Sequence, residues 1–206
     1  MEKLILIGAG GHAKSVADSI DKSKYELYGF IDSKKKGTHL GLPIWGTELE
    51  DISEYAQYSY FVSIGDVGYR KLWFDKISRR GLKIINIIDS SAIISASAKL
   101  GIGNFVGKMA VINADAEIGN NNVINTKALI EHECKVGNHN HLSTNSVING
   151  NVIVEDNVFM GSSSVCNGQL KIGHDSIIGS GSVIIRDVPA KVTVVGVPAR
   201  VIKRRD

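Results

Sequence analysis

Residues 130–142 read IEHECKVGNHNHL and hold three of the six histidines of this 206-residue chain, together with two glutamates. Imidazole is the side chain best suited to take up a proton near neutral pH, and a neighbouring carboxylate raises its basicity by stabilising the imidazolium. His132 is therefore a candidate general base, with Glu133 and Glu131 as equally near partners in sequence. A metal site and a solvated surface corner are the alternatives.

A second candidate site lies near the N-terminus. Residues 8–13, GAGGHA, fit the G-x-G-x-x-A pattern directly after an apolar run, and Asp32 closes the next apolar run at about the spacing of a ribose-binding acid. Glycines let the backbone approach phosphate, and a helix N-terminus favours anions. The pattern first suggests NAD, but this part of the chain has room for about four strands, too few for a full dinucleotide fold. A nucleotide sugar or a ligand-free turn remains open.

The elements that position this motif form a small α/β unit. Short β-branched or aromatic runs alternate with amphipathic stretches, which predicts a parallel sheet with helices between its strands. The runs are 3–8, 25–32, 60–65 and 82–88, and the amphipathic stretches are 12–20 and 69–81. Residues 34–47, with three glycines and one proline, are expected to form an exposed connection.

After residue 88 the apolar residues recur at every sixth position, which is the period of a hexapeptide β-helix. The position two residues earlier is usually Ala or Ser, as a tight corner requires. With three faces, three consecutive hexads make one coil. The repeating positions are Ile88, Ile94, Leu100, Val106, Ile112, Ile118, Ile124, Ile130, Val136, Leu142, Ile148, Val154, Met160, Cys166, Ile172, Ile178 and Ile184.

Composition excludes several classes of protein. Lys and Arg number 24 against 21 Asp and Glu, which gives no strong electrostatic attraction for nucleic acid. Two cysteines are too few for a disulfide framework, so a cytoplasmic location fits best. The apolar run at the N-terminus is too short for a signal segment or a membrane span. We therefore expect neither a nucleic-acid nor a membrane partner.

Four motifs carry a resemblance to a known family: GAGGH at 8–12, FID at 30–32, IEHECKVG at 130–137 and GVPAR at 196–200. With the hexad array, they resemble the hexapeptide acyltransferases of the bacterial nucleotide-sugar group. The nearest branch contains the bacillosamine-pathway N-acetyltransferase and the sialic-acid O-acetyltransferases. The resemblance implies a Rossmann-like α/β domain that holds a nucleotide sugar, followed by a left-handed parallel β-helix. It also implies a homotrimer with acetyl-CoA in the grooves between subunits.

The resemblance also assigns site residues. His132 and Glu133 are the catalytic pair, although many relatives carry aspartate at the second position. The residues implied to bind the nucleotide sugar are Gly10, Gly11, His12, Asp32, Ser33 and Gly65. The residues implied to contact acetyl-CoA are His141, Ser162 and Ser180.

The spacing of the histidines bears on both the oligomer and the metal. His141 lies nine positions after His132, which is half of one coil, so the two side chains should point to different edges of one chain. If both serve one reaction, a neighbouring subunit must supply one of them, which predicts intersubunit active sites. The same spacing scatters the ligands that zinc would need, so no metal is expected.

We therefore predict two domains, a nucleotide-sugar-binding domain at 1–88 and a β-helix acetyltransferase domain at 89–206 that ends in a short C-terminal segment. The expected reaction is acetyl-CoA-dependent N-acetylation of a nucleotide-linked 4-amino-4,6-dideoxy sugar, for surface glycan or glycoprotein synthesis. O-acetylation of a sialic acid or similar sugar is the first alternative. A metal-dependent hydratase and a non-enzymatic scaffold on the same solenoid are the others.

Overall fold

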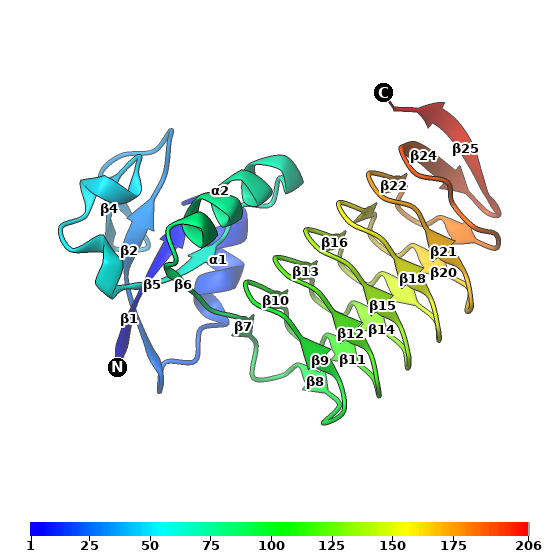
Figure 1. The fold of residues 1–206 in the computed structure, drawn as a ribbon, viewed down its shortest axis with the longest axis horizontal. Coiled ribbons are helices and arrows are strands. Elements are labelled where there is room, and N and C mark those ends of the chain that lie inside the picture. Colours follow the sequence, from blue (N-terminus) through cyan, green and yellow to red (C-terminus); the bar gives the residue numbers. More distant parts are fainter. Residues whose placement is uncertain (206) are drawn as a thin grey trace. The chain divides into compact units, whose positions relative to one another are not determined.

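The computed structural model describes residues 1–205. The chain forms two compact units, Met1–Ser90 and a unit that begins at Ser91. The first is the expected α/β unit and the second is the expected parallel β-helix, so the predicted order of fold classes is confirmed (Figure 1). Over residues 1–205, no helix is both long enough and apolar enough to cross a membrane.

The first unit is built on a mainly parallel sheet with the strand order β3-β4-β2-β1-β5-β6. Its central strand β1 pairs in parallel with β2 on one side and β5 on the other, and Leu4, Ile5 and Leu6 are fully buried. A continuous apolar run is typical of a strand covered on both faces. The elements predicted from the sequence are β1 (Glu2–Ile7), α1 (Gly11–Asp18), β2 (Tyr25–Ile31), β5 (Ser59–Val62), α2 (Val67–Arg79) and β6 (Lys83–Ile84).

Residues 34–47 are not the plain connection that their glycines suggested. They form a hairpin, β3 (Thr38–His39) and β4 (Leu42–Gly46), and β4 also pairs in parallel with β2. Leu40 and Gly41 take positive φ values of 51° and 78° and close the turn between the two strands. The glycines therefore mark a tight turn within the sheet. Two short 3₁₀ helices follow, η1 (Leu49–Asp51) and η2 (Tyr55–Gln57).

The turn from β1 into α1 requires glycine at its first position. Gly8 has a φ of 101°, and a Cβ atom there would lie 2.7 Å from the side chain of Ile64. The N-cap of α1 is Gly10, which offers no side chain to the first backbone N–H groups of the helix. In contrast, Asp66 caps α2 by accepting a hydrogen bond from the Tyr69 N–H at 2.9 Å. The first turn of α1 thus presents backbone donors without a carboxylate.

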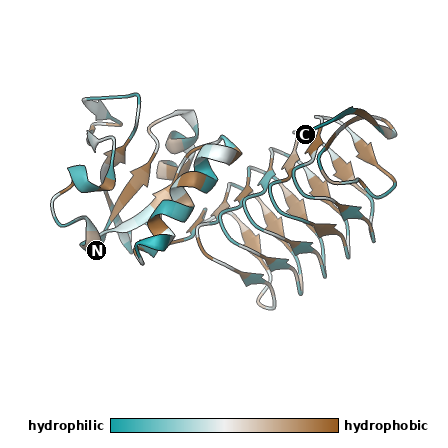
Figure 2. Ribbon diagram, turned by 45° about the horizontal axis from the view of Figure 1, so that its top comes forward, coloured by the Kyte–Doolittle hydropathy of each residue, from teal (hydrophilic) through white to brown (hydrophobic). Residues whose placement is uncertain are grey.

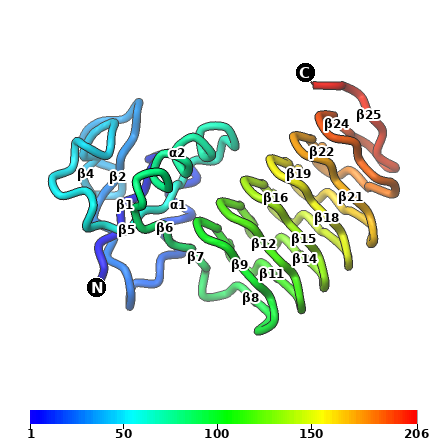
Figure 3. Tube along the Cα trace, viewed as in Figure 1, coloured from blue at the N-terminus to red at the C-terminus, as the bar shows by residue number. Residues whose placement is uncertain are grey.

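The second unit is a parallel β-helix made of two-residue strands (Figures 1 and 3). Each strand pairs with the equivalent strand of the next coil, as in Val111 with Leu129 and Leu129 with Val147. One coil therefore consists of three hexads and crosses three faces in turn, as the period of six predicts. Short β7 (Ile87–Ile88) precedes the coils.

The faces are named first, second and third in the order in which each coil crosses them. The first face contains β10 (Phe105–Val106), β13 (Val123–Ile124), β16 (His141–Leu142), β19 (Phe159–Met160) and β22 (Ile177–Ile178). The second contains β8 (Ile93–Ile94), β11 (Val111–Ile112), β14 (Leu129–Ile130), β17 (Val147–Ile148), β20 (Val165–Cys166) and β23 (Val183–Ile184). The third contains β9 (Lys99–Leu100), β12 (Glu117–Ile118), β15 (Lys135–Val136), β18 (Ile153–Val154) and β21 (Lys171–Ile172).

The hexad residues fill the interior of the β-helix. From Val106 to Ile184 every one is buried, and the strands carry the hydrophobic colour in Figure 2 while the corners are mostly polar. Ile94 and Leu100 are only partly buried, since the first coil has no coil before it to cover it. Ile88 departs from the pattern because it is 39% exposed. Both cysteines are buried, and burial raises the pKa of the Cys166 thiol to about 12.

The corners repeat one backbone conformation. Non-glycine residues with a φ near 60° recur at every sixth position from Met109 to Asp175, and Glu133 is one of them. At the corner between the third and first faces, buried asparagines one coil apart bond to the neighbouring coil: the Asn122 Oδ1 accepts from the Asn140 N–H at 2.8 Å. The chain ends in an antiparallel hairpin, β24 (Val192–Gly196) and β25 (Ala199–Arg204), in which β24 extends the first face by pairing with β22.

Candidate active site

A cavity of about 390 Å³ lies in the first unit at the carboxyl ends of β1, β2 and β5. Ligands of parallel α/β sheets bind at this edge. All six residues that the resemblance assigned to the nucleotide sugar line the cavity: Gly10, Gly11, His12, Asp32, Ser33 and Gly65. The backbone donors at the start of α1 belong to the same wall, which suits an anionic group.

Asp32 organises this cavity through the backbone. Its Oδ2 accepts from the Ala9 N–H at 2.7 Å, and its Oδ1 accepts from the N–H groups of Lys34 and Lys35 at 2.8 Å each. Partial burial opposes ionisation, but these three bonds hold the pKa of Asp32 below its ordinary value. The Lys35 ammonium also donates to the Ala9 carbonyl at 2.6 Å. The carboxylate thus fixes the glycine turn to the loop after β2.

A buried cation lies behind the cavity. Arg70 on α2 is 1% exposed and donates to the Gly65 carbonyl at 3.1 Å. Burial lowers the pKa of Arg70 to about 10, so the guanidinium stays charged at neutral pH. Burial, and secondly the charge of Arg70, lower the pKa of His12 to about 4. His12 is therefore a neutral imidazole in this wall.

The sequence analysis missed two aromatic residues of the cavity, Tyr69 and Trp73. They are four positions apart on α2 and so share one face of the helix. Their aromatic rings add flat apolar surface to the cavity that the glycine turn also lines. Their spacing was visible in the sequence, but nothing there showed that this face of α2 borders the cavity.

His132 lies on the corner between the second and third faces, in the turn from β14 to β15. Its Nδ1 is 3.0 Å from the Glu133 Oε2, and both side chains are exposed, at 59% and 62%. The left-handed backbone at Glu133, with a φ of 59°, turns the carboxylate back beside the ring. When Nδ1–H donates to Glu133, the lone pair lies on Nε2, where a proton can be accepted.

The two glutamates that flank His132 have different hydrogen-bond partners. The Glu131 Oε2 accepts from the Asn113 Nδ2 at 2.8 Å, across the gap between neighbouring coils. Glu131 and Asn113 are one coil apart in sequence and therefore stack at the same point of the corner. Glu133 is thus the carboxylate that contacts His132.

The three residues of the HNH sequence lie in different surroundings. His139 is 9% exposed, and its Nδ1 is 2.8 Å from the Asn121 Nδ2 of the preceding coil. Asn140 belongs to the buried asparagine ladder. His141 begins β16 on the first face, where its ring centroid is 5.2 Å from that of Phe159. Over residues 1–205, no group of three His, Cys, Asp or Glu side chains is placed to hold a metal ion.

The residues implied to contact acetyl-CoA lie apart from His132 within one chain. Ser162 and Ser180 occupy the corner between the first and second faces, one coil apart, and the Gly181 N–H donates to the Ser162 carbonyl at 2.9 Å. His141 lies on the first face itself. His132 lies at the other edge of the second face. One β-helix therefore does not bring the base and these residues together.

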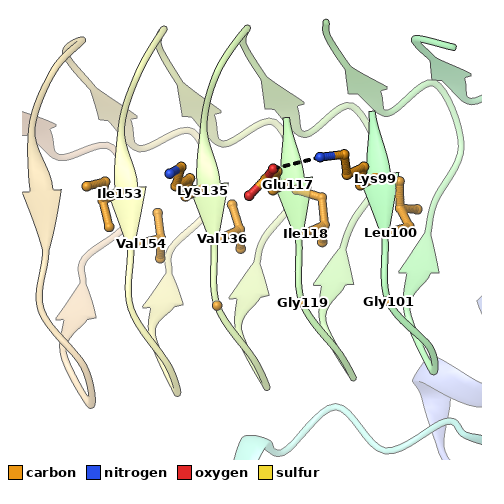
Figure 4. A pocket seen from close by; sticks show the side chains of 11 residues that line it. Lys99, Leu100, Gly101, Glu117, Ile118, Gly119, Lys135, Val136, Ile153 and Val154 are labelled. Carbon is orange, nitrogen blue, oxygen red and sulfur yellow. Dashed lines mark hydrogen bonds and ion pairs between the residues drawn. The ribbon is translucent and has the colours of Figure 1, made fainter. Parts of the chain in front are cut away.

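An open hollow of about 550 Å³ runs along the third face, and it contains none of the expected site residues. In Figure 4, Lys99, Glu117, Lys135 and Ile153 form its outer row, and the Lys99 ammonium pairs with the Glu117 carboxylate at 3.0 Å. The charged side chains of this row pair with one another or are exposed to solvent. The third face is a charged surface rather than a candidate active site.

A glycine-rich cavity in a small parallel α/β unit, followed by a β-helix with a histidine–carboxylate corner, defines a hexapeptide-repeat acyltransferase. Comparison with known proteins identifies the family. Residues 3–77 match the PglD N-terminal domain model. PerB from Caulobacter crescentus, in complex with CoA and GDP-perosamine, is 33% identical with a TM-score of 0.91, covering 98% of each chain. The acetyltransferase domain of PglB from Neisseria gonorrhoeae is 30% identical with a TM-score of 0.93, covering 98% of this chain and all of that one.

WeeI from Acinetobacter baumannii is 25% identical with a TM-score of 0.88, covering 98% of this chain and 100% of that one. An uncharacterised protein of Acanthamoeba polyphaga mimivirus is 37% identical over 102 residues, and the matched segment spans only 20% of its length. The chain belongs to the hexapeptide-repeat sugar N-acetyltransferases, whose β-helix is left-handed.

Proposed function

We propose that this protein transfers the acetyl group of acetyl-CoA to the amine of a nucleotide-linked 4-amino-4,6-dideoxy sugar. The observation that carries the proposal is the cavity of the first unit, which is lined by every residue expected to bind a nucleotide sugar. Its wall includes the start of α1, which has no side-chain cap, and the buried Arg70 guanidinium lies behind the wall; the helix N-terminus and the positive charge both favour a diphosphate. The aromatic residues Tyr69 and Trp73 suit the base or the sugar ring.

The chemistry needs one proton acceptor. The amine nitrogen attacks the thioester carbonyl carbon, the C–S bond breaks, and the proton of the amine passes to the Nε2 of His132 while CoA leaves as the thiolate. Glu133 holds the ring through Nδ1 and stabilises the imidazolium as it forms. Binding of both substrates removes the need for a bimolecular encounter between them.

We further propose a homotrimer whose active sites lie between subunits. His132 lies at one edge of the second face, whereas Ser162 and Ser180 lie at the other edge. If the second faces of three parallel copies turn toward a common axis, the edge with His132 in one copy approaches the edge with the serines in the next. A base from one subunit and acetyl-CoA contacts from another then form one site, and the family resemblance sets the number of copies at three.

The outer surface of the second face supports this assembly. Its outward positions are aliphatic in every coil, and none is fully buried in the single chain. On the third face most of the equivalent positions carry charge. A continuous apolar ladder on one flat face is typical of a subunit interface. The ladder consists of Ile93, Val111, Leu129, Val147, Val165 and Val183.

We place the reaction in the cytoplasm, where acetyl-CoA and nucleotide sugars are available and buried free thiols stay reduced. The product would be a building block for a surface glycan or glycoprotein.

Thiol release from acetyl-CoA tests the proposed function. The acceptors are GDP-perosamine, UDP- and dTDP-linked 4-amino sugars and a free sialic acid, each with wild type, His132→Ala and His174→Ala. We expect release with one amino sugar, a loss of about 10²–10⁴-fold in kcat in His132→Ala, and wild-type rates in His174→Ala. Release only with sialic acid would replace N-acetylation by O-acetylation. No release with any acceptor would contradict the proposal.

A further inference from the structure

Position 150 lies directly after His132 along the axis of the β-helix. The two residues are one coil apart, and the Asn151 N–H donates to the His132 carbonyl at 2.9 Å. The strands before them pair in the same register, Ile130 with Ile148. The side chain of His132 therefore extends along the corner toward the next coil, where the sequence places a glycine.

The imidazole occupies the space that a side chain at position 150 would need. A Cβ atom there would lie 2.6 Å from both Cε1 and Nε2 of His132, and 3.3 Å from Cδ2. Side-chain carbons are essentially never found this close to other heavy atoms. Nε2 is the nitrogen that carries the lone pair when Glu133 accepts from Nδ1–H, so the reactive edge of the ring faces the glycine.

Backbone conformation does not explain this glycine. Gly150 is absent from the residues of positive φ, whereas Gly8, Gly103 and Gly181 are among them. The φ of position 150 does not exclude alanine, and the three atoms nearest to an added Cβ all belong to the His132 ring. The ring is the end of a side chain, so a methyl group would displace the ring rather than the coil.

We propose that Gly150 is a positioning residue for His132: the missing side chain leaves the space in which the imidazole lies with Nδ1 on Glu133 and Nε2 free for the amine. This inference rests on the proposed role of His132 as the base. A methyl group at position 150 would move Nε2 and cover it at once. A misplacement of about 1 Å in a reacting group costs about 100-fold in rate.

A double-mutant cycle tests the proposal. In Gly150→Ala we expect kcat to fall about 100-fold, while the KM values for acetyl-CoA and the amino sugar change less than about threefold. In a His132→Ala background the same substitution should change kcat less than about twofold, because the displaced group is already absent. His174→Ala is the matched control, and in that background Gly150→Ala should keep its full effect. An equal loss in all three backgrounds would overturn the proposal, since Gly150 would then act without His132.

Melting curves keep the test informative if Gly150→Ala is unstable. If the methyl group clashes with the ring, His132→Ala restores the melting temperature and His174→Ala does not. A melting temperature that neither substitution restores, or unchanged kcat in Gly150→Ala, would overturn the proposal. The comparison of melting temperatures needs no substrate, so it tests the contact between position 150 and His132 even if the wild type is inactive with every acceptor. Inactivity with every acceptor would contradict the proposed function and not the role of Gly150.

Discussion

His132 and His174 make the same local contact at two corners of the β-helix. Each Nδ1 is bound to the carboxylate of the next residue, at 3.0 Å for Glu133 and 2.7 Å for Asp175. Both carboxylates lie on residues with left-handed backbone, so the two pairs share one corner geometry. What distinguishes His132 is its place beside the aliphatic second face and before a glycine. His174 lies on the corner between the third and first faces.

Glu133→Gln tests whether the charge of the carboxylate contributes to catalysis, in addition to holding the His132 ring in place. Glutamine keeps the shape of the side chain but removes the charge that stabilises the imidazolium, so we expect kcat to fall by at least about tenfold with little change in either KM. Steady-state thiol release measures both constants. Asp175→Asn makes the equivalent change at His174 and should leave both unchanged. Equal kcat in Glu133→Gln and wild type would remove Glu133 from the mechanism.

His12 makes stability depend on pH in the acid range. Burial lowers its pKa in the folded protein to about 4, below the ordinary value of 6.5, so the unfolded chain binds the proton first. Above about pH 6.5, His12 is neutral in both states and does not reduce the free energy of unfolding. As the pH falls from about 6.5 to about 4, the unfolded chain takes up a proton that the folded protein does not, and the free energy of unfolding falls by about 3 kcal/mol. Urea unfolding of wild type and His12→Gln at pH 7.5 and 4.5 measures this. The wild type should lose more stability than the variant, and parallel losses would contradict the prediction.

At the scale of elements, the repeat was the most predictable feature. A period of six fixes which residue of each two-residue strand points inward, because successive residues of a strand face opposite sides. The hexad residues from Val106 to Ile184 are accordingly buried. Ile88 fits the period but is 39% exposed, because a sequence period does not show which members of the repeat are covered. The β3–β4 hairpin was missed because its pairing with β2 depends on residues distant in the chain.

The asparagine ladder is an element that joins successive coils at one corner of the β-helix. Asn122 bridges three coils. Its Oδ1 accepts from the Asn140 N–H, and its Nδ2 donates to the Asn104 Oδ1 at 3.1 Å and to the Gly137 carbonyl at 2.9 Å. Side chains one coil apart thereby satisfy backbone groups that are hidden from water.

Asn122→Ala should therefore be strongly destabilising. The substitution leaves the buried Asn140 N–H without its acceptor and the Gly137 carbonyl without this donor, which we expect to cost about 2–4 kcal/mol of unfolding free energy. Urea denaturation followed by circular dichroism measures the loss. Asn167→Ala is the control, because Asn167 is an exposed corner residue, and it should change stability by less than about 0.5 kcal/mol. Similar losses in both variants would mean that the ladder does not stabilise the coils.

At the scale of the whole molecule, the candidate site was only partly predictable. The motifs named the residues of the cavity and the His132 corner, since short signatures mark local turns. The sequence did not reveal Tyr69 and Trp73 as cavity residues, because their place in the cavity wall depends on how α2 packs on the sheet. Gly150 was also missed, although its spacing of one full coil from His132 could have revealed it. A coil period converts sequence distance into spatial contact at the corners as well as in the core.

The apolar ladder of the second face makes the strongest prediction for the assembly. Val147→Lys places a charge within it, and burying an unpaired lysine against an apolar neighbour is costly. We expect this variant to be monomeric by light scattering and to lose acetyl transfer, since His132 would no longer meet the acetyl-CoA contacts of another copy. Ile153→Lys is the matched control: Ile153 is the outward aliphatic residue of the same coil on the third face and is 43% exposed (Figure 4). That variant should keep the wild-type mass and rate. A monomeric Val147→Lys protein with full activity would mean that one chain contains the entire site.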